Sequence, residues 1–220
     1  MVENPFTYPE SKTWAHRVNT MEEARIKSSV FEGLEIDLYY NPRTDQLLLG
    51  HDLQDTINGL NLDAWLEAVE EPAAHYYWLD MKNLNADNAA RIADNINRVA
   101  EKWHITDHVM IEQWDVSALK IIKKHGLHVI LWVDNLYESG HSEEKWRLTM
   151  QKDIDNLHPN AISGNYQMFH ILTECFPEQN IHLWDTPKEY NETNVTHTRM
   201  LIQHPSIKVV LVDYPESVTP

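Results

Sequence analysis

Two acidic side chains, Glu35 and Asp37, lie two residues apart in the otherwise apolar stretch Gly33–Tyr40. In a β-strand alternate side chains share a face, so both carboxylates point one way and the leucine and isoleucine side chains around them point the other way. Two like charges side by side are costly unless a cation lies between them. The pattern therefore indicates a functional site rather than a core strand.

A second strand-like stretch, Tyr76–Lys82, places the acid Asp80 and the base Lys82 two residues apart. Glu35, Asp37 and Asp80 together would form an all-oxygen ligand set, which suits one divalent cation, Mg²⁺ or Ca²⁺, rather than zinc. The alternative is that these acids are strand-end charges in salt bridges. Lys82 could place a positive charge on a phosphoryl oxygen, or could form a structural ion pair with Asp80 or Glu112.

Two histidines, His16 and His51, follow strand-like segments. A pair of imidazoles beside a metal can serve as general acid and general base near neutral pH. Because the chain has 13 histidines, position near a strand end does not by itself separate a catalytic pair from structural histidines.

The segments that must position these residues alternate between strand and helix patterns. The chain has 220 residues, near the low end for an eight-stranded α/β barrel. Strands that alternate with helices indicate right-handed βαβ units and a parallel sheet. We expect a single domain over residues 1–220, an α/β protein with the closed (β/α)8 TIM barrel fold; the alternative is an open doubly wound sheet. The eight expected strands are Thr13–Val18, Gly33–Tyr40, Tyr76–Lys82, Val109–Trp114, His128–Asp134, Ala161–Asn165, Ile181–Thr186 and Ile207–Asp213.

Two of the intervening helices have expected limits that can be compared directly with the structure. A capping box of Thr20 and Glu23 predicts a helix from about Met21 to Phe31. A later helix is expected around Thr198 to Gln203, and the first dozen residues are expected to be an irregular lead-in.

Polar and aromatic residues concentrate where these strands end, which in a barrel is the mouth that holds the active site. Trp132 and Trp184 could wall a substrate pocket, although tryptophans at such places also serve as core. Glu112 and Asn165 are candidate substrate contacts, with simple rim positions as the alternative. The strand-end residues are His16, Glu35, Asp37, Asp80, Lys82, Glu112, Trp132, Asp134, Asn165, Trp184 and Asp213.

Composition excludes several partners. The formal net charge of −16 argues against nucleic acid and against electrostatic docking onto anionic membranes. Cys175 is the sole cysteine, so neither an intramolecular disulfide nor a zinc–thiolate cluster can form. No run is long and apolar enough for a membrane helix, and no signal peptide stands at the start as given. We expect a soluble protein, cytoplasmic or exported with its signal removed, without an obligate protein partner.

Common nucleotide-binding and serine-hydrolase signatures, Gly-x-Gly-x-x-Gly, Gly-Lys-Ser/Thr and Gly-x-Ser-x-Gly, are absent. The chain instead contains, in order, the short motifs Ala15–Thr20, Glu35–Asp37, Gly50–Asp52, Leu79–Lys82, Ile181–Thr186 and Val212–Pro215. Together these resemble the motifs of the glycerophosphodiester phosphodiesterases. Val18 stands where these phosphodiesterases usually have Gly, and the small insertion usual after His51-Asp52 is missing. In these respects the chain is more similar to the sphingomyelinase D-like phospholipases, and Asn58–Leu66 resembles the menorin relatives.

The resemblance implies a PLC-like phosphodiesterase barrel that acts on a small glycerophosphodiester or (lyso)phospholipid-like substrate. In it the three carboxylates hold the cation, and His16 and His51 form the acid–base pair. A substrate hydroxyl could be the nucleophile, which would give a cyclic phosphate. The alternatives are a barrel that binds metal and phosphate without turnover, and a glycosidase with a carboxylate pair. Expected substrate contacts are Lys82, Arg17, Glu112, Trp132, Asn165 and Trp184.

Overall fold

The computed structural model describes residues 5–219, and within them eight parallel strands close into a barrel. The closure is made by β1, which pairs with β9 on one side and with β2 on the other. The predicted closed (β/α)8 barrel is therefore confirmed, and the open doubly wound sheet is wrong. The barrel strands are β1 (Thr13–Ala15), β2 (Gly33–Asn41), β4 (Tyr76–Met81), β5 (Val109–Gln113), β6 (His128–Trp132), β7 (Ala161–Asn165), β8 (Ile181–Trp184) and β9 (Ile207–Val212).

The remaining strand, β3 (Gln46–Leu49), runs antiparallel to the second half of β2 and lies outside the closed ring. Leu49 is level with Leu38, and the Gly50 N–H donates to the carbonyl of Asp37 at 3.0 Å. A Cβ atom at Gly50 would lie 2.7 Å from the Cβ of Asp55, so only glycine fits this return of the chain. The β2–β3 hairpin thus places the segment after β3 next to Asp37.

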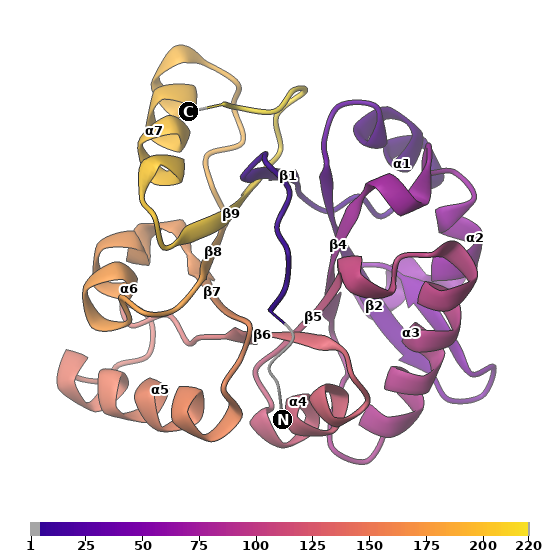
Figure 1. The fold of residues 1–220 in the computed structure, drawn as a ribbon, viewed down its shortest axis with the longest axis horizontal. Coiled ribbons are helices and arrows are strands. Elements are labelled where there is room, and N and C mark those ends of the chain that lie inside the picture. The colour runs from indigo at the N-terminus through magenta and orange to yellow at the C-terminus, as the bar shows by residue number, and fades with distance from the viewer. Residues whose placement is uncertain (1–4, 220) are drawn as a thin grey trace.

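Seven α-helices surround the ring of strands in the described part of the chain (Figure 1). Their starts follow capping chemistry: the Thr20–Glu23 capping box is present, and the Asn61 and Ser142 side chains accept N–H groups of the following turns. None of the helices in residues 5–219 combines the length and apolar character needed to cross a membrane. The helices are α1 (Met21–Ser28), α2 (Leu62–Leu66), α3 (Ala89–Trp103), α4 (Val116–Lys124), α5 (Glu143–Leu157), α6 (Phe169–Cys175) and α7 (Glu192–Gln203).

Two predicted helix limits are wrong. Helix α1 ends at Ser28 rather than near Phe31, where the Val30 N–H donates to the carbonyl three residues back, that of Lys27, in place of the α-helical bond. Helix α7 begins at Glu192, well before Thr198, because the Asn191 side chain caps it by accepting the N–H of Asn194. In both places a local hydrogen bond, rather than the apolar pattern, decides the limit.

The strands are buried on both faces, as parallel strands between a core and covering helices must be. Leu34, Ile36 and Leu38 pack outward beneath the helices, while Trp14 and Trp78 fill the barrel interior. The interior is so tightly filled that a Cβ atom at Gly33 would lie 2.0 Å from the indole of Trp14. The barrel is therefore a packed core with its polar residues gathered at one end.

The opposite end is closed by the segment before β1, which crosses the centre of the ring in Figure 1. Phe6 packs edge-on against His128, the first residue of β6, and the Tyr8 hydroxyl lies 3.0 Å from Nε2 of the buried His182. Burial lowers the pKa of His182 to about 3, so this imidazole is neutral. The expected lead-in is irregular within residues 5–12, and residues 1–4 lie outside the described residues.

Candidate metal centre and active site

The three predicted carboxylates meet at the carboxyl end of the barrel. Asp37 and Asp80 are direct neighbours across β2 and β4, and Glu35 lies one inward position earlier on β2. One oxygen of each lies within 4.8 Å of the others. Glu35 and Asp37 are only 3% and 1% exposed, so water does not screen their charges as it would at a rim. The three acids therefore form one cluster, in which Glu35 and Asp37 are buried and Asp80 is partly exposed.

The loop between β1 and α1 fixes two of these carboxylates. Asn19 donates from Nδ2 to Asp37 Oδ2 at 2.6 Å and accepts the Asp37 N–H at 2.9 Å, while the Arg17 N–H donates to Glu35 Oε2 at 2.7 Å. Arg17 takes a left-handed φ of 51°, a strained conformation for a non-glycine residue, and this aims its N–H at Glu35. Its own side chain is exposed. Asn19 was not predicted, although it lies within the Ala15–Thr20 motif.

The Lys82 ammonium lies between two of the acids, with Nζ at 2.5 Å from both Asp37 Oδ1 and Asp80 Oδ2. Burial alone would lower the pKa of Lys82, but the two carboxylates outweigh it and raise the pKa above its ordinary value. Of the two interpretations left open by the sequence, the structure contains the ion pair with Asp80, together with a second one to Asp37.

One ammonium does not neutralise three carboxylates, of which Glu35 and Asp37 are buried and Asp80 is partly exposed. Burial raises the pKa of Glu35 well above its usual range, and repulsion from Asp37 and Asp80 raises it further. Burial also raises the pKa of Asp80, against the opposing pull of Lys82. A divalent cation would relieve this repulsion, and hard carboxylate oxygens are the donors that Mg²⁺ and Ca²⁺ prefer. The residues present therefore fit the expected cation.

His16 is held beside this cluster by an acid from the last strand. Its Nδ1 lies 3.3 Å from Asp213 Oδ1, and its Nε2 lies 4.0 Å from Glu35 Oε2. Burial raises the pKa of Asp213, but the hydrogen bond and charge of His16 outweigh it and lower the pKa overall. Asp213 was predicted only as a strand-end charge, and its pairing with His16 spans β9 and β1. The pairing leaves Nε2 of His16 facing the acids.

His51 stands on the short segment that the β2–β3 hairpin returns to Asp37. Its side chain is 39% exposed, with Nδ1 3.4 Å from Asp52 Oδ1. A positive charge on His51 would oppose the rise in the pKa of Asp80. The structure thus places His16 beside Glu35, and His51 directly after Gly50, whose N–H donates to the Asp37 carbonyl.

Glu112 lies under the mouth rather than on its rim. It is 4% exposed, accepts a 3.0 Å hydrogen bond from Nε1 of Trp78, and is hydrogen-bonded by the Ser163 hydroxyl. Burial, with repulsion from Asp80, raises its pKa to about 8. The rim interpretation of Glu112 is therefore wrong. Trp78 and Ser163 were not predicted, although strand alternation places both on the inward faces of their strands.

The far side of the mouth carries the two predicted tryptophans. Trp132 and Trp184 stack with ring centres 6.4 Å apart and planes 16° from parallel. Nε1 of Trp184 is buried without a hydrogen-bond partner among the described residues. Asn165 donates to Asp185 Oδ2 at 3.0 Å and accepts the Gln167 N–H at 2.9 Å, so it fastens two loops together. The two indoles thus stack on each other, and Asn165 links the residues that follow β7 and β8.

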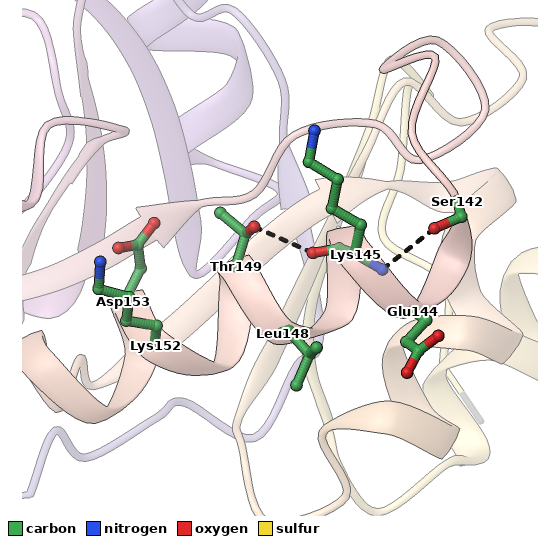
Figure 2. A pocket seen from close by; sticks show the side chains of 7 residues that line it. All are labelled: Ser142, Glu144, Lys145, Leu148, Thr149, Lys152 and Asp153. Carbon is green, nitrogen blue, oxygen red and sulfur yellow. Dashed lines mark hydrogen bonds between the residues drawn. The ribbon is translucent and has the colours of Figure 1, made fainter.

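A surface hollow of about 410 Å³ lies elsewhere, along α5 (Figure 2). Its lining comes from that helix and its cap alone: within it the Lys145 N–H donates to the Ser142 hydroxyl, and the Thr149 hydroxyl donates to the Lys145 carbonyl. No residue of the acidic cluster takes part, so this hollow does not mark the site.

The described residues form a closed (β/α)8 barrel with a polar mouth, and comparison with solved structures agrees on this fold. The chain is similar to an Oleispira antarctica phosphodiesterase in complex with the product sn-glycerol-3-phosphate, with 12% identity, 94% of each chain covered and a TM-score of 0.67. It is also similar to a calcium-dependent phosphoinositol-specific phospholipase C from Pseudomonas sp., with 11% identity, 94% of this chain and 89% of that one covered, and a TM-score of 0.58.

The same fold also serves a different role. A glycerol uptake operon antiterminator regulatory protein from Listeria monocytogenes matches with 9% identity, 96% of each chain covered and a TM-score of 0.58. Comparisons with protein-family models and with curated protein sequences gave no match. The resemblance to the glycerophosphodiester phosphodiesterases is therefore confirmed for the fold, and function must be argued from the site.

Proposed function

We propose that this chain is a divalent-metal-dependent phosphodiesterase that cleaves a glycerophosphodiester or a (lyso)phospholipid-like substrate. One observation carries the proposal. A cluster of three carboxylates, two of them buried, shares the barrel mouth with two histidines and a lysine, and His16 is oriented toward the cluster by Asp213. A cation, a proton acceptor and a proton donor held at one place are together able to cleave a phosphoric diester.

Glu35, Asp37 and Asp80 would hold the cation. When bound, the cation acts as a Lewis acid on a non-bridging phosphoryl oxygen. Lys82 supplies a second positive charge beside the same carboxylates, which stabilises negative charge on phosphoryl oxygens as it develops. Asn19 and the Arg17 N–H hold Asp37 and Glu35 in place and so fix the ligand geometry.

His16 and His51 move the protons. With Nδ1 of His16 engaged by Asp213, its Nε2 is the atom that exchanges a proton at the mouth. One histidine takes the proton of the attacking hydroxyl or water, and the other gives a proton to the departing alkoxide as the P–O bond breaks. If the nucleophile is a hydroxyl of the substrate beside the phosphate, the reaction is intramolecular, gains from proximity and forms a cyclic phosphate. The stacked rings of Trp132 and Trp184 then face the alcohol group of the substrate that departs.

Phosphorus NMR tests the proposal. The protein is incubated with glycerophosphodiesters and lysophospholipids in the presence of Mg²⁺ or Ca²⁺, and again with chelator. We expect a phosphomonoester or cyclic phosphate only with the cation, and we expect His16→Ala to lose turnover. His170→Ala, an exposed histidine on α6, is the matched control. Unchanged turnover in His16→Ala, or consumption of no diester under any condition, would refute the proposal.

A second candidate function is a barrel that binds metal and phosphate without turnover. Two features of the site favour it. Val18 replaces the glycine usual in the phosphodiesterases, and Lys82 engages two of the three acids. Val18 is nevertheless fully buried, and its N–H donates to the Glu35 carbonyl at 2.9 Å, so the loop keeps its contact with β2. Saturable metal and phosphate binding in the absence of any product would favour this second function.

A further inference from the structure

Asp213, which engages His16, is the first residue after β9, and the segment that it begins has little main-chain support. Among the described residues, no backbone-to-backbone hydrogen bond involves residues 213–217. His16 itself is tied to the end of β9, because its N–H donates to the Val212 carbonyl at 3.1 Å. The position of the Asp213 carboxylate beside the imidazole therefore depends on the side chains that fix the residues after it.

Tyr214, the residue after Asp213, is held both by its side chain and by its main chain. It is fully buried, with its ring 5.4 Å from that of Tyr190 and its hydroxyl 3.3 Å from the Thr198 hydroxyl. Its carbonyl accepts a hydrogen bond from the Lys27 ammonium of α1. Helix α1, near the indigo end of the colour scale, and this yellow segment thus meet next to β1 (Figure 1).

The Lys27 ammonium is placed by more than this one bond. The side chain is half-buried, and Nζ lies 5.2 Å from the centre of the Phe31 ring. Burial lowers the pKa of Lys27, against the opposing charges of Asp213 and Glu23. A neutral side chain of the same length would lose the attraction to both acids together with the hydrogen bond.

Glu23, one helical turn before Lys27, supports the carboxylate cluster. Its Oε2 accepts the Asn19 N–H at 3.1 Å and the Thr20 N–H at 3.0 Å. Asn19 in turn donates to Asp37 Oδ2 at 2.6 Å. Residues four apart face the same side of a helix. One face of α1 therefore carries a carboxylate that fixes the loop behind the proposed cation ligands and an ammonium that fixes the segment behind His16.

We propose that Lys27 is a positioning residue, which holds the segment of Asp213 in place and so keeps Nε2 of His16 facing the carboxylates. A lysine that only tied a helix to a loop would stabilise the fold without affecting the imidazole. The effect of Lys27 on turnover rests on the proposed function, whereas its effect on the orientation of His16 does not. The two can therefore be tested separately.

Three variants distinguish positioning from simple stabilisation. Lys27→Met removes the ammonium and keeps a side chain of similar length against Phe31, and Lys27→Arg restores a donor and a positive charge. Lys12→Met is the matched control. Lys12 is also half-buried and donates to the carbonyls of Ile202 and His204 at 2.8 and 3.2 Å, but it precedes β1, at the amino end of the barrel.

The first measurement is the nitrogen NMR spectrum of the imidazole side chains at pH 8 in chelator, where an ordinary histidine is neutral. A ring nitrogen that carries a proton resonates apart from one that does not, and the His16 signals are identified by their loss in His16→Ala. In the unmodified protein we expect the proton on Nδ1, which faces Asp213. Lys27→Met should shift the Nδ1 signal toward the average of the two tautomers, whereas Lys27→Arg and Lys12→Met should leave it in place.

The second measurement is turnover of a soluble glycerophosphodiester with Mg²⁺ or Ca²⁺. Lys27→Met should lower kcat by roughly tenfold with KM and cation affinity unchanged, the low end of the effect of groups that orient a functional side chain. Adding Lys27→Met to Asp213→Asn should lower kcat little further, because both substitutions act on the same imidazole.

An unchanged His16 spectrum in Lys27→Met, or an equal shift in Lys12→Met, would overturn the proposal. A shifted spectrum with unchanged kcat in an active enzyme would overturn it as well. A shifted spectrum in a protein that consumes no diester would support the positioning of His16 by Lys27 and refute the proposed function. Diester cleavage with an unchanged spectrum would do the reverse.

Discussion

Replacing Lys82 by methionine tests the charge balance of the acidic cluster. Lys82→Met removes the ammonium that lies 2.5 Å from both Asp37 and Asp80, while a side chain of similar length still fills its space. Removing one partner of a buried ion pair typically costs 3–5 kcal/mol. Because Lys82 is 18% exposed and the acids can take up protons, we expect the low end, about 3 kcal/mol. For a chain of this size that lowers the Tm by about 6–12 °C.

The assay is thermal unfolding in chelator and then in saturating Mg²⁺ or Ca²⁺. The cation should restore most of the lost Tm, because it takes the place of the missing positive charge, and cation at about 100 times its Kd adds roughly 2.7 kcal/mol. Lys102→Met is the control, since Lys102 pairs with Asp63 at the surface and is 53% exposed. That variant should change stability by less than about 1 kcal/mol. The reasoning fails if Lys82→Met melts like the unmodified protein in chelator, or if neither cation raises its Tm.

Two further predictions concern the groups around the cluster. Asp213→Asn should lower kcat by about 10–100-fold while leaving Mg²⁺ affinity unchanged in calorimetric titration, because Asp213 orients His16 and contacts no proposed ligand; equal losses of kcat and metal affinity would contradict this role. Folding raises the pKa of Glu112 from an ordinary value near 4.5 to about 8. Between these pH values the folded state therefore holds one proton more than the unfolded state. Glu112 thus makes the free energy of unfolding fall as pH rises through that window, by up to about 1.4 kcal/mol per pH unit. Glu112→Gln should remove this part of the slope in denaturant unfolding followed from pH 5 to pH 8, and an unchanged slope would show that Glu112 is ionised in the folded protein.

The barrel and its acidic cluster follow from local rules, which is why the sequence predicts them. Alternation puts Glu35 and Asp37 on one face of their strand, and parallel strands bring their carboxyl ends together. The proximity of Asp80 to both acids can therefore be predicted even when the pairing register of the strands is unknown. Burial of Glu112 depends on how Trp78 and Ser163 reach it from neighbouring strands. No spacing within one segment encodes that contact.

Pairings between distant segments are what the sequence does not show. His16 and Asp213 are joined only because β9 closes the ring onto β1. In the same way, Phe6 closes the floor only because the segment before β1 crosses the barrel and meets residues that begin other strands. Local pattern describes that segment as irregular, which is correct and says nothing of where it packs.

The most direct test of the central claim is a crystal structure grown with Mn²⁺, a hard cation that favours the same oxygen ligands as Mg²⁺, and with glycerol phosphate. The account predicts one cation at about 2.0–2.6 Å from oxygens of Glu35, Asp37 and Asp80. It also predicts a phosphoryl oxygen on that cation, with Nε2 of His16 facing the phosphate and the Lys82 ammonium released from Asp37. A cation bound elsewhere, with Lys82 still between Asp37 and Asp80 and no anion at the mouth, would contradict it.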